Sequence, residues 1–319
     1  MRPFVNRRTF LQSTAVAALG PALSATAVAA AAGAVHPPII DTHTHFYDPA
    51  RPEGVPWPGK QDPLLYRTTL PKDYRQQAVP HPVTATVVVE ASPWVEDNQW
   101  ILDLAARDPF IVGLVGNLPV GTPEFAALLK RFAANPVFRG LRVNHGALQK
   151  GLTQAPYLDD LRRLADADLE LDINGGPTLL PDAARLAEKL PDLRIVINHV
   201  ANVRIDGKAP PTPWLEGIRA AAAHPRVFCK VSALVEGTGR SDASAPRAVD
   251  FYRPILDAVW QAFGEDRLIY GSNWPVSQRF APLATVQAIA ADYFAAKGPV
   301  AREKFFARNA ATAYRWIKR

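Results

Sequence analysis

Cysteine is nearly absent from this chain of 319 residues, which contains Cys229 alone. A single thiol cannot form an internal disulfide bond, which excludes a disulfide-stabilised scaffold. Cys229 lies inside an apolar run with the pattern of a strand. We therefore expect it to be a packed core residue rather than a reactive thiol.

A strongly hydrophobic run long enough to span a membrane is also missing. Residues 13–32 are rich in alanine but only weakly apolar, and they follow the twin-arginine sequence NRRTFLQ at positions 6–12. Small residues at Ala25, Ala27 and Ala29 offer cleavage sites. This pattern predicts a cleaved twin-arginine (Tat) signal peptide over residues 1–36 and a periplasmic mature domain over residues 37–319, with no transmembrane span after cleavage.

A large charge excess is absent once the predicted signal is removed. The full chain has 36 basic and 30 acidic residues, and the signal carries three arginines and no acid, which leaves a net charge of +3. No basic stripe is visible, so we expect no nucleic-acid partner. The sequence carries no indication of the oligomeric state, and a small-molecule substrate is the partner that we expect.

A glycine-rich phosphate-binding loop does not follow the first apolar strand, which counts against a nucleotide-binding sheet. What is present is an alternation of apolar strand patterns with amphipathic helical stripes, which predicts parallel strands joined by helices. The predicted strands are Ile39–Thr42, Ala85–Glu90, Phe110–Gly116, Gly140–Asn144, Leu169–Ile173, Leu193–Asn198, Val227–Val231 and Arg267–Gly271. Eight strands favour a single-domain α/β fold, a (β/α)8 TIM barrel, over the competing open doubly wound sheet.

Helices are predicted between and after these strands. Their ranges are Pro71–Gln77, Asp97–Arg107, Thr122–Ala133, Tyr157–Ala167, Pro181–Lys189, Pro213–Ala223, Tyr252–Phe263, Leu283–Phe294 and Val300–Trp316. The stretch Phe46–Val83 between the first two strands holds eight prolines. A connection this long is usually functional, and we expect it to cover part of a site.

Polar residues stand where the predicted strands end, which is where chemistry takes place in such barrels. His43 and His45 are two residues apart on the first strand, so their side chains share one face. The later strand ends add Glu90, then Arg142, Asn144 and His145, then Asp172 and Asn174, then Asn198 and His199, then Lys230 and Ser232, and finally Ser272, Asn273 and Trp274. Converging imidazoles suit a divalent metal or an anionic substrate.

These motifs resemble those of the amidohydrolase superfamily. The matching segments are Asp-Thr-His-Thr-His at 41–45, Asn-His at 198–199 and Gly-Ser-Asn-Trp-Pro at 271–275, and the likeness is strongest to the amidohydrolase-related group that contains sugar-acid lactonases such as L-fuconolactonase. The resemblance implies a hydrolase whose strand-one and strand-six histidines surround the reacting carbonyl, often with a divalent metal. In that family an aspartate on strand eight activates the attacking water.

The chain departs from that family in ways that limit the metal site. Strand five lacks the histidine of binuclear members, and strand four offers no bridging lysine or glutamate. We therefore expect one divalent metal at most, held by His43, His45 and His199 with Glu90 as a candidate fourth ligand. Three histidines and an open position suit zinc, although a metal-free mechanism is left open.

The strand-eight position is Asn273, and an amide cannot take a proton from water. The candidate proton acceptors are then Glu90, followed by Asp172 and by His199 if it is not a ligand. Asn273 itself can only coordinate weakly or donate and accept hydrogen bonds.

Substrate binding is assigned to Arg142, Lys230 and Trp274. The two cations could attract a carboxylate or polarise a lactone carbonyl, or instead form salt bridges with Glu90 or Asp172. The sequence thus predicts an exported, metal-assisted hydrolase of a lactone or related cyclic ester of a sugar acid or small carboxylic acid. The alternatives are a barrel that binds a small carboxylate or carbohydrate without turnover, and a decarboxylase on the same fold.

Overall fold

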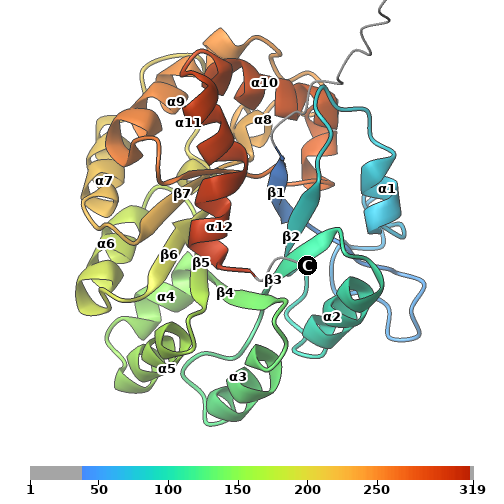
Figure 1. Cartoon of the computed structure of the whole chain (residues 1–319), viewed down its shortest axis with the longest axis vertical. Coiled ribbons are helices and arrows are strands. Elements are labelled where there is room, and N and C mark those ends of the chain that lie inside the picture. Colours follow the sequence, from blue (N-terminus) through green and yellow to red (C-terminus); the bar gives the residue numbers. More distant parts are fainter. Residues whose placement is uncertain (1–37, 317–319) are drawn as a thin grey trace, which may run out of the picture. The chain divides into compact units, whose positions relative to one another are not determined.

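Eight parallel strands follow one another around a barrel in chain order (Figure 1). The computed structural model describes residues 38–316. The strands are β1 (Ile40–Thr44), β2 (Ala85–Val89), β3 (Ile111–Gly116), β4 (Phe138–Asn144), β5 (Glu170–Asn174), β6 (Arg194–Ile197), β7 (Val227–Val231) and β8 (Leu268–Tyr270). Each pairs in parallel with the next, and a bridge between Thr44 and Trp274 brings the chain after β8 back to β1. The (β/α)8 barrel predicted from the alternation is confirmed.

Asp41 holds the seam between β1 and the end of β8. Its Oδ1 accepts hydrogen bonds from the backbone N–H groups of Ser272 (2.9 Å) and His43 (3.1 Å), and its Oδ2 accepts one from the Tyr74 hydroxyl at 2.7 Å. Burial raises the pKa of Asp41, and these hydrogen bonds partly offset that cost. The aspartate of the first motif therefore fixes the backbone beside the histidines.

Amphipathic helices cover the outside of the barrel. They are α2 (Asp97–Arg107), α3 (Phe125–Ala133), α5 (Ala155–Asp166), α6 (Leu179–Lys189), α7 (Thr212–Ala222), α9 (Val249–Phe263) and α10 (Leu283–Ala295). In α3, for example, Phe125, Leu129 and Phe132 share one face and are buried. All seven were predicted from their apolar stripes, with ends that differ by a few residues.

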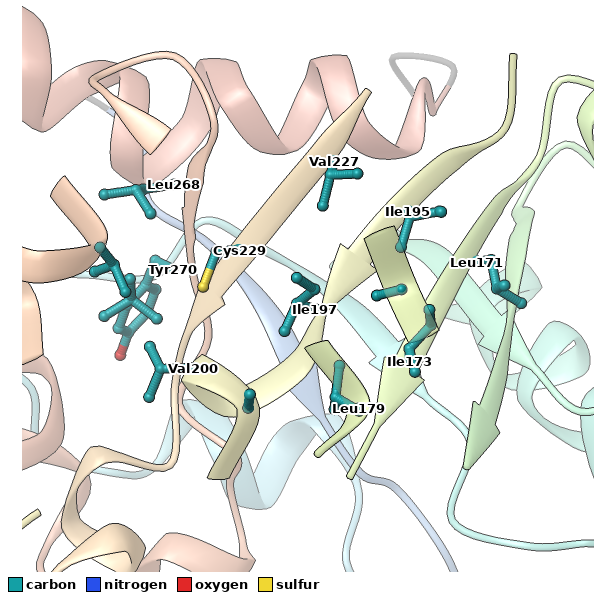
Figure 2. Close-up of a cluster of buried hydrophobic side chains, with 14 of the residues drawn as sticks. Leu171, Ile173, Leu179, Ile195, Ile197, Val200, Val227, Cys229, Leu268 and Tyr270 are labelled. Atoms are coloured by element: carbon teal, nitrogen blue, oxygen red, sulfur yellow. The ribbon is translucent and has the colours of Figure 1, made fainter. Parts of the chain in front are cut away.

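The main core lies between these helices and the outward face of the strands. Figure 2 shows part of it, where Leu171, Ile195 and Val227 come from neighbouring strands and are paired in register. Cys229 lies in the same layer and is fully buried, and burial raises the pKa of its thiol to about 12. The prediction that Cys229 is an inert core residue agrees with this environment.

Short helices at the strand ends were not predicted. They are α4 (His145–Gly151), the 3-10 helix η1 (Asn198–Asn202), α8 (Leu234–Gly237) and the 3-10 helix η2 (Val276–Arg279). The Pro-rich stretch after β1 contains only the short helix α1 (Pro71–Arg75).

The single helix predicted over Val300–Trp316 is divided into three parts. They are α11 (Pro299–Glu303), the π-helical turn η3 (Lys304–Arg308) and α12 (Asn309–Tyr314). Tyr314 packs inside the barrel with Val196 and Phe228. Within residues 38–316 we find no helix that combines the length and apolar character needed to cross a membrane. The predicted signal peptide lies outside the described residues.

Candidate active site

The three histidines predicted to act together do converge. The ring centroids of His43 and His45 lie 5.0 Å apart, and those of His43 and His199 lie 4.3 Å apart. Burial lowers the pKa of each imidazole, to about 3 for His45, and nearby cations such as Lys230 and Arg142 lower it further. The cluster is therefore uncharged at neutral pH.

Left-handed backbone conformations gather at the ends of β6, β7 and β8. His199 has φ 56°, Ala233 has φ 52° and Asn273 has φ 58°. Each such residue costs about 1–3 kcal/mol when it is not glycine, and strain of this kind is concentrated at functional sites. The sharp turns direct the side chains that follow each strand across the barrel opening.

A cavity of about 920 Å³ opens at this end of the barrel. Its lining includes five of the predicted site residues, namely His45, Glu90, Arg142, His199 and Asn273. The amides of Asn144, Asn174 and Asn202, from the ends of β4, β5 and β6, line it as well. We call this lining the cavity wall.

Trp57 brings the long first loop to the cavity wall. Its ring lies against His45, with centroids 5.7 Å apart. Elsewhere in this loop Asp62 forms a salt bridge with Arg279 of η2 at 2.6 Å. The loop therefore contributes to the site, as its length predicted.

Four other predicted site residues do not line this cavity. Lys230 and Asp172 are fully buried and form an ion pair at 2.7 Å, and Lys230 also lies 3.3 Å from Nδ1 of His43. The Tyr314 hydroxyl donates to the second oxygen of Asp172 at 3.2 Å. We call His43, Asp172, Lys230 and Tyr314 the sealed cluster.

Trp274 is likewise fully buried and packs against Phe46 and Tyr74 rather than facing the cavity.

Arg142 and Glu90 form the salt bridge that the sequence left as one of two interpretations. Arg142 Nε donates to Glu90 Oε1 at 2.8 Å, and its Nη2 donates to the Glu90 carbonyl oxygen at 2.6 Å. Both side chains remain partly exposed in the cavity wall. The contacts fix the plane of the guanidinium while leaving it in reach of a ligand.

Comparison with known proteins decides the family. The amidohydrolase family model (Amidohydro_2) matches residues 40–316. The chain belongs to the amidohydrolase family. The resemblance seen in its motifs is thereby confirmed, and the protein is a hydrolase.

Two curated relatives of this amidohydrolase carry the same name. It is 34% identical over 291 residues to an L-fucono-1,5-lactonase of Burkholderia ambifaria, which covers 86% of this chain and 95% of the relative. It is 25% identical over 244 residues to an L-fucono-1,5-lactonase of Burkholderia multivorans, which covers 74% and 82%. A solved amidohydrolase from Burkholderia multivorans with bound zinc has a TM-score of 0.74 at 24% identity and covers 88% of this chain and all of that one.

The three histidines that would hold the zinc expected from the family differ in whether their Nε2 atom can bind a metal. The Nδ1 atoms of His45 and His199 contact the Val89 carbonyl (2.9 Å) and Ser232 Oγ (2.8 Å), which leaves Nε2 of each ring on the cavity side, with His45 Nε2 3.3 Å from Asn273 Oδ1. The Lys230 ammonium, however, donates to Nδ1 of His43 and so places the imidazole proton on Nε2, which is buried without a partner. A protonated nitrogen cannot bind a metal. The three histidines therefore do not fit a three-ligand site.

The arrangement of the other potential ligands leads to the same conclusion. Among residues 38–316, no group of three or more His, Cys, Asp or Glu side chains is arranged to hold a metal ion.

Glu236 is a cavity residue that the sequence analysis missed. It lies on α8, it lines the cavity, and its Oε1 accepts a hydrogen bond from Asn273 Nδ2 at 2.9 Å. Burial raises the pKa of its carboxyl to about 7. The four-residue helix has no apolar periodicity, so only the polar residues shortly after a barrel strand could have indicated it.

Proposed function

We propose that this amidohydrolase hydrolyses a lactone of a sugar acid. The observation that carries the proposal is the composition of the cavity wall, which includes Arg142 and three asparagines, Asn144, Asn174 and Asn202. Amides donate and accept hydrogen bonds and suit a substrate with several hydroxyl groups. The named activity of the Burkholderia relatives supports the same substrate class.

Arg142 is the group that we assign to the lactone carbonyl. Attack by water converts that carbonyl to an oxyanion, and a guanidinium held in place by Glu90 can donate to it without reorganising. Neutral His45 and His199 contribute hydrogen-bonding groups without adding positive charge. Trp57 supplies an apolar surface for the face of the sugar ring.

A panel of lactones read with a pH indicator tests the proposal. L-fucono-1,5-lactone and other hexonic-acid lactones should be hydrolysed with kcat/KM at least about tenfold above δ-valerolactone, which lacks the hydroxyl groups that the asparagines would bind. Arg142→Met should lower kcat/KM by about 10²-fold, as expected for removal of an oxyanion donor. Hydrolysis no faster than in buffer across the panel would contradict the proposal. Sugar-acid binding without turnover would then favour a binding barrel, and carbon dioxide release from a carboxylic acid would favour a decarboxylase.

The metal and the cellular location remain predictions. The zinc content of the purified protein tests the metal prediction, and about one equivalent per chain would support a metal-assisted reaction. A few tenths of an equivalent or less would contradict the zinc prediction, but it would not contradict a metal-free lactonase. Export to the periplasm depends on Arg7 and Arg8, which lie outside the described residues.

A further inference from the structure

Asn273 and Glu236 are arranged as a pair. The left-handed turn at Ala233 ends β7 and starts α8, which places the Glu236 side chain beside Asn273 at the end of β8. Glu236 Oε1 accepts the amide hydrogen bond, and its Oε2 is buried with no hydrogen-bond partner among the described residues. A carboxylate oxygen in this position has an unused lone pair next to the reaction cavity.

The amide of Asn273 satisfies both of its neighbours only when that carboxyl is protonated, because in the ionised state Asn273 Oδ1 faces the lone pair of His45 Nε2. His45 donates from Nδ1 to Val89, so its Nε2 carries a lone pair that faces Asn273 Oδ1 at 3.3 Å. With Glu236 ionised, Asn273 Nδ2 donates to it. With Glu236 protonated, a half-turn of the amide lets Oδ1 accept from the carboxylic acid and Nδ2 donate to His45.

An aspartate at position 273 could not fill this role beside Glu236. It would place two carboxyl groups within about 3 Å, and like charges at that distance prevent both groups from ionising. The asparagine that departs from the family pattern therefore stands beside a carboxylate, Glu236.

We propose that Glu236 is the general base of this hydrolase and that Asn273 is its positioning residue. The inference rests on the proposed lactone hydrolysis. The other candidate acceptors are less available, since Glu90 engages the Arg142 guanidinium and Asp172 is fully buried against Lys230. His199 also lines the cavity, but burial and the nearby cations Lys230 and Arg142 lower the pKa of its imidazole well below the ordinary value, which makes it a weaker proton acceptor.

The reaction balances with Glu236 as proton carrier. As the water oxygen bonds to the lactone carbonyl carbon, a water proton passes to Glu236 Oε2 and the carbonyl oxygen becomes an oxyanion facing Arg142. The oxyanion then re-forms the carbonyl, the bond from that carbon to the ring oxygen breaks, and the ring oxygen takes the proton from Glu236. Glu236 is again ionised, and the product is a hydroxy acid.

The surroundings of Glu236 keep the pKa of its carboxyl near neutral pH. Burial raises the pKa to about 7, while the Asn273 hydrogen bond acts in the opposite direction. The titratable group that interacts with it is Tyr252 of α9, which Arg240 also approaches, and the cavity also holds His45, Glu90, Arg142, His199 and Arg279. A base with a pKa near the working pH is the most effective one.

Paired glutamate-to-glutamine variants test the proposal on the wild-type substrate found in the lactone panel. Glu236→Gln should lower kcat by about 10²–10⁴-fold and remove the rise of kcat/KM with pH that we expect for wild type near pH 7. Glu90→Gln should lower kcat as well, because it loosens Arg142, the oxyanion donor, but it should keep that rise. Glu216→Gln, on an exposed residue of α7, is the matched control and should stay within about twofold of wild type. Circular dichroism and thermal melting check that each variant is folded.

The outcomes separate the two proposals. Wild type without lactone turnover would overturn the proposed function and the base assignment with it. If wild type is active, Glu236→Gln that keeps kcat within about threefold and retains the pH-dependent rise overturns the base assignment alone. A loss of the rise in Glu90→Gln but not in Glu236→Gln would overturn it as well.

Discussion

His43 and His45 are two residues apart on one strand, yet they belong to different environments. His43 is in the sealed cluster, where it is fully buried, Lys230 contacts its Nδ1, and it is not part of the cavity wall. His45 is in the cavity wall, where its Nε2 faces an amide oxygen and a tryptophan ring. A step of two residues along the strand therefore separates a structural histidine from a histidine that a substrate can contact.

The same contrast holds for the charged residues. Lys230 and Asp172 satisfy each other in the sealed cluster, with Tyr314 as a further partner. In the cavity wall, by comparison, Glu236 keeps an unpartnered oxygen. Paired charges support the fold, whereas a charge with a free lone pair can take part in a reaction.

Breaking the sealed cluster should have the largest effect on stability. Lys230→Met removes the ammonium and leaves the carboxylate of Asp172 buried without its cation. We expect the free energy of unfolding to fall by about 3–5 kcal/mol, measured by urea denaturation at pH 7.

Arg162→Ala gives the contrasting control, because it breaks an exposed i,i+3 pair with Asp159. It should cost less than about 1 kcal/mol. If Lys230→Met costs no more than this control, the sealed cluster is not a structural element.

The sequence predicts the barrel because its signals are local. Apolar strand runs and helical stripes, such as Phe125, Leu129 and Phe132, are determined by nearby residues and are buried as expected. The convergence of His43, His45 and His199 follows from the same regularity, since parallel strands end at one edge of the sheet.

The division between sealed and reactive residues could not be predicted in the same way. Whether Asp172 faces a substrate depends on Lys230 and Tyr314, which are 58 and 142 residues away in sequence. Glu236 was missed because a four-residue helix after a left-handed turn leaves no periodic pattern. Whether a strand-end side chain is buried inside the barrel or lines the cavity depends on tertiary contacts, and the spacing of motifs in the sequence does not predict it.

Glu236→Gln should also change stability, in a direction that depends on pH. The pKa of Glu236 is raised from 4.5 to about 7 in the folded protein, so between these values the unfolded chain loses its proton first. Wild type therefore loses stability as the pH rises through this range, and glutamine does not.

We expect Glu236→Gln to be more stable than wild type by about 3 kcal/mol at pH 8 and nearly equal to it at pH 4.5. Denaturation curves at the two pH values measure the difference. If the difference in unfolding free energy between variant and wild type is the same at pH 4.5 and pH 8, Glu236 does not bind a proton in this range. The cavity wall would then hold no group that titrates near neutral pH, and its contrast with the sealed cluster would not be a chemical one.

Trp57→Ala should have the smallest effect, because it changes the cavity wall without removing a charge. The ring covers His45 and lines the cavity, so its loss should raise KM about tenfold for a sugar lactone, with kcat less affected. Trp94→Ala is the matched control, since Trp94 is 42% exposed and does not line the catalytic cavity. Equal effects of the two substitutions on KM would show that the first loop contributes no substrate contact, and the cavity wall would then be built from the strand ends alone.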